Sequence, residues 1–129
     1  MHGERTYFDA SAFVKLFADE PESPALRGRV SRIVSSDLLV IEARRAARRL
    51  GGRAVALAEA AIPAVRLIPI GVEVRDRAAS IGSPSLRSLD AVHLATADLI
   101  RDDLDALVTY DDRLGAAAAA LGIPVLSPR

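Results

Sequence analysis

Acidic residues stand at four places where predicted strands end or predicted helices begin. Asp9 directly follows the short apolar run RTYF, and Asp111 follows the run DALVT. Glu42 lies early in the helical segment after the run RIVSS, and Asp90 lies in the first turn of the segment SLDAVHLATADLI. In open parallel sheets, ligands bind beyond the carboxyl ends of the strands. The four acids are therefore candidates for a single site.

Several carboxylates held close together point to a bound cation. They repel one another and raise each other's pKa values unless a positive charge neutralises them. Oxygen ligands without cysteine suit Mg²⁺ or Mn²⁺, and Mg²⁺ keeps several waters, so a few carboxylates suffice. Water on such a metal can attack a phosphodiester, while the metal offsets charge on the phosphate oxygens. The acids therefore predict metal-assisted phosphodiester hydrolysis.

The elements that must position these acids alternate between short apolar runs and longer amphipathic segments. The predicted strands are RTYF, RIVSS, VRLIPI, DALVT and IPVLS. The predicted helices cover residues 11–18, 25–30, 38–50, 54–61, 72–81, 88–100 and 112–121, with Pro21 and Pro24 as breaks between the first two. Right-handed crossovers return each strand to the same sheet, so the pattern predicts a three-layer α/β/α fold with a mostly parallel central sheet.

Composition indicates one globular domain over residues 1–129. Half of the residues are apolar and 26% are charged, which is not the composition of a disordered chain. There is no apolar run of roughly 20 residues and no signal-peptide pattern, so we expect a cytoplasmic protein with no membrane partner. The chain has no cysteine, which excludes a zinc ribbon, and its 17 basic and 17 acidic residues balance. A nucleic-acid partner must therefore be attracted by a local basic patch.

The stretches YFDASAFVK, LLVIEARRA, SLDAVHLATA and LVTYDDRL resemble the PIN-domain ribonucleases, and most closely the VapC toxins of toxin–antitoxin pairs. The resemblance covers the chain from Tyr7 to about Val125. It implies a PIN-like nuclease domain with Mg²⁺-dependent endoribonuclease activity, in which Mn²⁺ can substitute. It also implies an RNA substrate, a cognate antitoxin whose tail covers the site, and a homodimer. The site residues that it implies are the metal-binding and catalytic acids Asp9, Glu42, Asp90 and Asp111, with Ser11 and Thr109 as polar neighbours that orient them.

Two adjacent acids, Asp111 and Asp112, compete for the position after the run DALVT. Strand alternation puts Thr109 and Asp111 on the same side, so we assign Asp111 to the site. Asp112 then falls in the first turn of the next helix, where its charge gains from the helix dipole without any metal.

Each candidate also has a purely structural interpretation. Asp9 could be the N-cap of the helix that follows it, and Glu42 could be a surface acid. Asp90 is less suited to capping because Ser88 is the better candidate for its helix. His93 follows Asp90 by three residues on an apolar segment, which favours a hydrogen-bonded core position over a ligand.

The run RRAARR at 44–49 concentrates arginines just after Glu42 and is either an RNA-binding track or a solvated helix face. Possible RNA contacts are Arg45, Arg49, Arg87 and Arg113. Besides an RNA-cleaving toxin, the sequence allows a housekeeping PIN nuclease or a non-catalytic PIN-like scaffold that binds RNA or protein. A phosphohydrolase with an aspartyl nucleophile is disfavoured, because it would want an aspartate where Ser11 stands.

Overall fold

The central sheet is parallel throughout. The computed structural model describes residues 5–27 and 32–129. Within these ranges the sheet has five strands: β1 (Arg5–Phe8), β2 (Arg32–Ser36), β3 (Arg66–Ile68), β4 (Ala106–Val108) and β5 (Val125–Leu126). Their order is β3-β2-β1-β4-β5, and each neighbouring pair is parallel. From β1 the chain adds β2 and β3 on one side and then β4 and β5 on the other. The strand order therefore reverses between β1 and β4, and sheets of this kind bind ligands at that point.

The strands lie where the sequence predicts them, although the last three are shorter than the predicted runs. β1 and β2 have the predicted bounds. β3 stops before Pro69, and β5 starts after Pro124. Proline has no backbone N–H to donate to a strand ladder, so it confines strands to its flanks.

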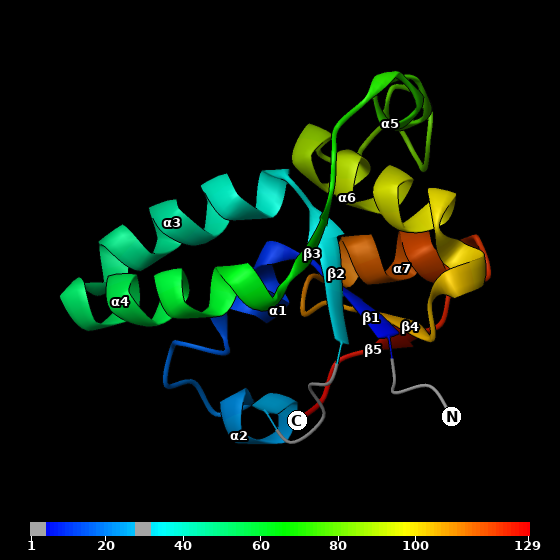
Figure 1. Cartoon of the computed structure of the whole chain (residues 1–129). Coiled ribbons are helices and arrows are strands. Elements are labelled where there is room, and N and C mark those ends of the chain that lie inside the picture. Colours follow the sequence, from blue (N-terminus) through cyan, green and yellow to red (C-terminus); the bar gives the residue numbers. More distant parts are fainter. Residues whose placement is uncertain (1–4, 28–31) are drawn as a thin grey trace.

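Helices surround the sheet on both faces (Figure 1). They are α1 (Ala10–Val14), α2 (Ser23–Arg27), α3 (Leu38–Leu50), α4 (Gly52–Ala61), α5 (Val72–Ala78), α6 (Ser88–Leu99) and α7 (Asp112–Ala120). Two 3₁₀ turns, η1 (Ile62–Ala64) and η2 (Arg101–Asp103), were not predicted. The longest helix, α3, has 13 residues, and no helix in the described part of the chain is long and apolar enough to cross a membrane.

The first two helices differ most from the prediction. The helix predicted over 11–18 ends at Val14, and the helix predicted over 25–30 begins earlier, at Ser23. Residues 28–30 of that prediction lie outside the described residues. Pro24 is not a break but a member of the first turn of α2, where its missing N–H would have no helical partner anyway.

Two apolar cores fill the space between the three layers, which confirms the predicted α/β/α architecture. One core packs α1 to α4 against the sheet and includes Phe8 of β1 and Val108 of β4. The other packs α5 to α7 against the opposite face and includes Tyr7 and Leu107 of the same two strands. Adjacent strand residues enter different cores because side chains alternate across a strand.

Helices α3 and α4 form an antiparallel pair that extends beyond the sheet (Figure 1). Gly51 joins them with φ of 113°, a conformation that favours glycine. Arg44 of α3 donates from Nε to Glu59 Oε1 of α4 at 2.7 Å. This pairing directs Arg44 toward α4 and leaves the other arginines of α3 on its remaining faces.

Candidate active site

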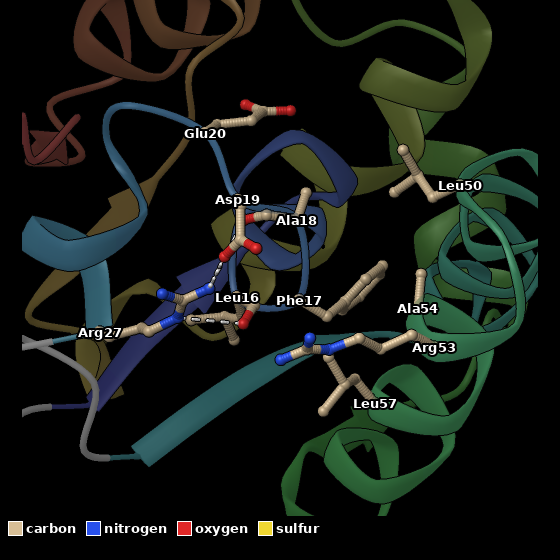
Figure 2. Close-up of a pocket in the computed structure, with 10 residues that line it drawn as sticks. All are labelled: Leu16, Phe17, Ala18, Asp19, Glu20, Arg27, Leu50, Arg53, Ala54 and Leu57. Carbon is tan, nitrogen blue, oxygen red and sulfur yellow. Dashed lines mark hydrogen bonds and ion pairs between the residues drawn. The ribbon is translucent and has the colours of Figure 1, made fainter.

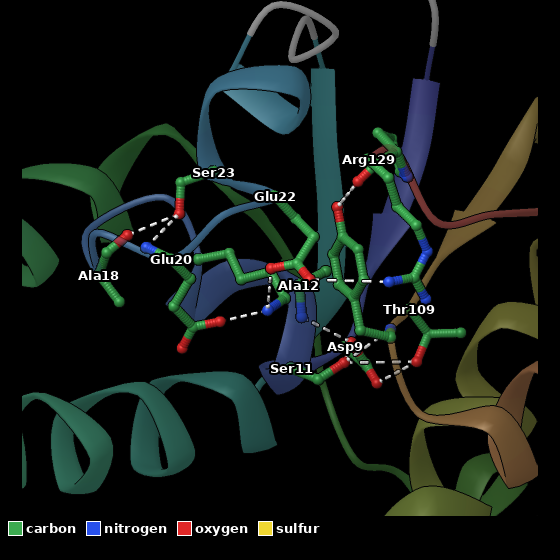
Figure 3. A network of polar contacts seen from close by, with 12 residues as sticks. Asp9, Ser11, Ala12, Ala18, Glu20, Glu22, Ser23, Thr109 and Arg129 are labelled. Atoms are coloured by element: carbon green, nitrogen blue, oxygen red, sulfur yellow. Dashed lines mark hydrogen bonds and ion pairs between the residues drawn. The ribbon is translucent and has the colours of Figure 1, made fainter.

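Asp9 is the buried acid of the site. It follows β1, is 3% exposed and caps the N-terminus of α1. Its Oδ1 accepts hydrogen bonds from Ala12 N at 3.0 Å and Ser11 Oγ at 2.7 Å, and its Oδ2 accepts from Thr109 Oγ1 at 2.6 Å (Figure 3). The structural prediction that Asp9 caps a helix is confirmed, and both predicted polar neighbours contact its carboxylate.

Burial and hydrogen bonding act on Asp9 in opposite directions. Burial raises the pKa of Asp9, because desolvation disfavours the charged form. The hydrogen bonds from Thr109, Ala12 and Ser11 lower the pKa, because they stabilise the carboxylate. The raised pKa that results marks Asp9 as an acid whose charge is not fully compensated by its surroundings.

Asp111 lies beside Asp9 through a shared hydroxyl. Thr109 Oγ1, which donates to Asp9, accepts a hydrogen bond from Asp111 N at 3.0 Å. Asp111 is the N-cap of α7 and accepts from Leu114 N at 2.9 Å. Asp112 is exposed in the first turn of α7. The structure therefore gives the two adjacent acids different environments: the backbone of Asp111 is bonded to Thr109, the residue after β4, whereas Asp112 is exposed.

Asp90 is half-buried in the first turn of α6, where the negative charges of the other acids affect its pKa. Burial is the main cause that raises its pKa, followed by the negative charges of Asp111 and Asp9, with a smaller contribution from Glu42. The other three predicted acids thus lie within electrostatic reach of Asp90. The prediction that Ser88 caps α6 is wrong, because Arg87 occupies the N-cap position with extended backbone and Ser88 is already helical.

Glu42 is held by a histidine from the opposite helical layer. His93 Nε2 lies 2.6 Å from Glu42 Oε1, and His93 Nδ1 lies 2.7 Å from the Tyr7 hydroxyl. His93 is 1% exposed, which confirms the hydrogen-bonded core position predicted for it. Its contact with Glu42 was not predicted. The available signal was the spacing of His93 and Asp90, since residues three apart share one face of a helix.

The oxygen-rich set of side chains fits a hard divalent cation in its chemistry, although the acids are engaged with protein donors. Among residues 5–27 and 32–129, no three side chains of His, Asp or Glu converge closely enough to hold one metal ion as they stand. Carboxylate oxygens are nevertheless the ligands that Mg²⁺ and Mn²⁺ prefer. Repulsion from its acidic neighbours contributes to the raised pKa of Asp90, and a bound cation would remove that repulsion.

A hollow of about 530 Å³ is lined by one of the four acids, Glu42, and by Ala10 and Leu89, the sequence neighbours of Asp9 and Asp90. Ser11 and Glu42 border it, and Lys15, Arg45 and Arg49 line it as well. The structure therefore places two of the four predicted RNA-contacting arginines in the hollow that Glu42 borders. The other two, Arg87 and Arg113, are exposed at the N-terminal ends of α6 and α7, whose first turns carry Asp90 and Asp112.

A second hollow of about 530 Å³ lies between the α1–α2 segment and the α3–α4 pair (Figure 2). Its walls combine apolar side chains, among them Phe17, Leu50 and Leu57, with the charged side chains of Arg27 and Arg53. None of the four site acids lines it. Glu20 borders both hollows, so this surface of mixed apolar and charged side chains adjoins the hollow that Glu42 borders.

Comparison with known proteins gives consistent matches along the chain. The PIN domain family model matches residues 6–120. Ribonuclease VapC46 of Mycobacterium tuberculosis is 43% identical over 126 residues, covering 95% of this chain and 96% of that protein. Ribonuclease VapC35 of the same species is 38% identical over 129 residues with the same coverage. These matches span almost the full length of both relatives.

Solved structures share the fold at lower sequence identity. A toxin–antitoxin complex from Klebsiella pneumoniae matches with a TM-score of 0.73 and 24% identity, over 96% of this chain and 98% of that one. The sarcin–ricin loop cleaving toxin VapC20 of Mycobacterium tuberculosis matches with a TM-score of 0.71 and 17% identity, over 95% and 99%. The fold has three layers around a parallel sheet, with acids beyond the carboxyl ends of its strands. Together with the match of the PIN family model over most of the chain, this defines a PIN-domain protein. Within that family the chain belongs to the VapC ribonucleases.

Proposed function

We propose that this chain is a metal-dependent endoribonuclease, consisting of one PIN domain and acting as the toxin of a toxin–antitoxin pair. The observation that carries the proposal is the placement of Asp9 directly after β1 and of Asp111 just after β4, where both contact the hydroxyl of Thr109. The negative charges of these two acids also raise the pKa of Asp90 in the first turn of α6. Relatives at 38% and 43% identity that carry the name ribonuclease support RNA as the substrate.

In this proposal Asp9, Glu42, Asp90 and Asp111 hold Mg²⁺, for which Mn²⁺ can substitute. When bound, the cation supplies an activated water and offsets negative charge on the phosphate. The protein's part is to hold its ligands in place. Asp9 is fixed by three hydrogen bonds, and Asp111 is fixed by the amide of Leu114. Ser11 and Thr109 orient these acids through their hydroxyls rather than acting as ligands.

The substrate backbone requires positive charge near the acids. Arg45 and Arg49 line the hollow that Glu42 borders, so they are the arginines best placed to bind phosphates of single-stranded or looped RNA. Arg87 and Arg113 stand at the N-terminal ends of the helices whose first turns bear Asp90 and Asp112. We assign Arg87 and Arg113 the weaker role of contacting RNA phosphates that lie farther from the cleavage site.

A cognate antitoxin and a second copy of the chain are the proposed protein partners. The hollow of Figure 2 offers apolar side chains bordered by charge, a surface that suits the apolar face of an amphipathic helix. A helix seated there could send an arginine past Glu20 to the acids. One matching structure is itself named as a toxin–antitoxin complex, which supports a partner of this kind.

Cation binding and RNA cleavage, measured on the same variants, test the proposed activity. We expect Mn²⁺ to bind the wild-type chain in a calorimetric titration and a single-stranded RNA to be cleaved only when the metal is present. The double variant Asp9→Asn, Asp90→Asn should lose both, because it removes two carboxylate charges while keeping side-chain shape. The exposed acid Asp102 of η2 supplies the matched control, and Asp102→Asn should retain both. Metal binding and cleavage that persist in the double variant would contradict the site, whereas a wild-type chain that binds RNA without cutting it would favour the scaffold.

A further inference from the structure

A buried hydrogen-bonded chain ends on one of the four acids and is not used by the proposed function. Tyr7 lies in β1, His93 in α6 and Glu42 in α3, so the chain links three elements and both helical layers. Tyr7 is 0% exposed and His93 is 1% exposed, whereas the Glu42 side chain is 19% exposed and borders the hollow that Arg45 and Arg49 also line. A fully buried pair of polar side chains therefore reaches outward to a carboxylate at the site.

The direction of the two hydrogen bonds follows from the chemistry of the groups. An ionised carboxylate can only accept hydrogen bonds. His93 Nε2 must therefore carry a hydrogen and donate a hydrogen bond to Glu42 Oε1. In the neutral ring, Nδ1 is then an acceptor, and the Tyr7 hydroxyl donates to it. Burial raises the pKa of Tyr7, so its hydroxyl keeps the proton that it donates. Tyr7 thus selects the tautomer in which His93 can bind Glu42.

Packing fixes the imidazole in the orientation that this chain requires. The rings of Tyr7 and His93 meet edge to face, with centroids 5.7 Å apart and planes inclined by 76°. Glu42 would otherwise have a partner on its own helix, since Arg45 lies three residues further along α3 and is exposed. The contact with His93 instead directs Glu42 toward α6, whose first turn carries Asp90.

We propose that Tyr7 and His93 are positioning residues that hold Glu42 in the orientation needed to bind the cation and, through it, the scissile phosphate. The inference rests on the proposed function, because it gives Glu42 a place among the metal ligands. Hydrogen-bonded partners of ligating carboxylates typically contribute about 10- to 100-fold to metal affinity or activity. A purely structural chain, which only satisfies buried polar groups, would instead contribute to stability and leave metal affinity unchanged.

Four variants separate the two roles, with Mn²⁺ affinity by calorimetric titration as the main readout. His93→Phe keeps an aromatic ring and removes the donor, so we expect Mn²⁺ to bind about 10- to 100-fold more weakly. His93→Gln places an amide N–H near the position of Nε2 and should restore most of that affinity. Tyr7→Phe should weaken binding when made alone. It should add no further loss in the His93→Phe background, because it acts only through His93.

A measurement on the wild-type protein keeps the test independent of how well the variants fold. Nitrogen-15 spectra of the imidazole should show the proton of neutral His93 on Nε2, and Tyr7→Phe should shift the ring toward the other tautomer. A proton found on Nδ1 instead would overturn the inference, and so would unchanged Mn²⁺ affinity in a folded His93→Phe protein. Failure of the wild-type chain to bind Mn²⁺ in an Asp9-dependent way would overturn the proposed function and this inference with it. Wild-type binding with no effect of His93 would overturn this inference alone.

Discussion

Asp111 and Asp112 are neighbours in the sequence, yet their side chains lie in different surroundings. Asp111 contributes to the raised pKa of Asp90 and receives an amide hydrogen bond from Leu114, whereas Asp112 is exposed. We expect Asp111→Asn to reduce metal-dependent RNA cleavage by at least about tenfold more than Asp112→Asn. Initial cleavage rates at saturating Mn²⁺ give this comparison.

Asparagine is the suitable replacement at both positions, because it keeps a hydrogen-bonding side chain at the N-cap. Asp112→Asn should cost only its interaction with the helix dipole, about 0.3 to 1 kcal/mol of stability. Thermal unfolding of both proteins would show whether they remain folded. If Asp112→Asn proved the more damaging to cleavage, the site would involve the other acid of the pair.

The raised pKa of Asp90 predicts a pH dependence of stability in the metal-free protein. An acid whose native pKa lies above its unfolded value of about 3.9 favours folding most at low pH. Its contribution is lost as the pH rises from about 4 through the raised native pKa. With a chelator present, we expect the free energy of unfolding of the wild-type chain to fall relative to that of Asp90→Asn as the pH rises over this range.

Denaturant unfolding at a series of pH values measures this slope. Asp9 also has a raised pKa, so some slope should remain in Asp90→Asn. Asp102→Asn should behave as the wild type because that acid is exposed in η2. Identical slopes for Asp90→Asn and the wild-type chain would show that the carboxyl group of Asp90 is not destabilised by its neighbours. Added Mn²⁺ should stabilise the wild-type chain at neutral pH more than Asp90→Asn, because the cation neutralises the repulsion and the variant lacks one of the proposed ligands.

At the scale of elements, the faces of α3 predict which arginines bind RNA. Arg45 and Arg49 line the hollow that Glu42 borders, whereas Arg44 is paired with Glu59 of α4. In an Asp9→Asn background that leaves the RNA uncut, we expect Arg45→Gln and Arg49→Gln each to weaken binding. Each should also lower the slope of log affinity against log salt by about 0.7, the value for one phosphate contact on a single strand.

Fluorescence anisotropy of a labelled single-stranded RNA at several salt concentrations provides this slope. Arg44→Gln is the matched control, because it removes the same charge from the same helix on the face toward α4. An equal change of slope for Arg44→Gln and Arg49→Gln would mean that α3 attracts RNA only through its overall charge.

The elements were predictable where local signals agree, and they were not where tertiary contacts decide. β1, β2 and α3 have the predicted bounds, since their apolar periodicity is bounded by polar or glycine residues. The helix predicted over 11–18 runs too far, because apolar side chains beyond Val14 enter the core from non-helical backbone. The contact of Glu42 with His93 joins residues 51 apart in the sequence. The spacing of His93 and Asp90 puts both on one face of α6, but it does not show which residue of another helix that face meets.

At the scale of the whole molecule, the alternation of strands and helices predicted three layers but not the order of the strands. The reversal at β1 places Asp9 and Thr109 side by side, although they are 100 residues apart. Asp9 was predictable as a site residue because it follows a strand and the carboxyl ends of parallel strands share one edge, whereas Thr109 was indicated only by the resemblance to the PIN-domain ribonucleases. Their hydrogen bond depends on β1 pairing with β4, which is a property of the assembled sheet.

The proposed toxin activity predicts an effect on cells that depends on a single buried carboxylate. We expect expression of the chain in bacteria to arrest growth, because cleavage of cellular RNA stops protein synthesis. Asp9→Asn should relieve the arrest, and Asp102→Asn should not. Growth curves with immunoblots to equalise protein levels make the comparison. Equal growth with wild type and Asp9→Asn would favour a non-catalytic role.

Asp9 and Asp111 cap helices in addition to their proposed place in the site. In related sequences that have lost the activity, these two acids should therefore be retained longer than an acid with no capping role. α1 and α7 each begin with an aspartate that accepts an amide hydrogen bond, and removing such a cap costs about 0.5 to 2 kcal/mol. Selection for folding alone would therefore retain these two residues in an inactive copy. Asp90 stands inside α6 rather than at its cap, and the charges around it make its own charge unfavourable. It should be the first of the three aspartates to drift to a neutral residue, so the residue at position 90 is the better indicator of whether a divergent copy of this chain is still an enzyme.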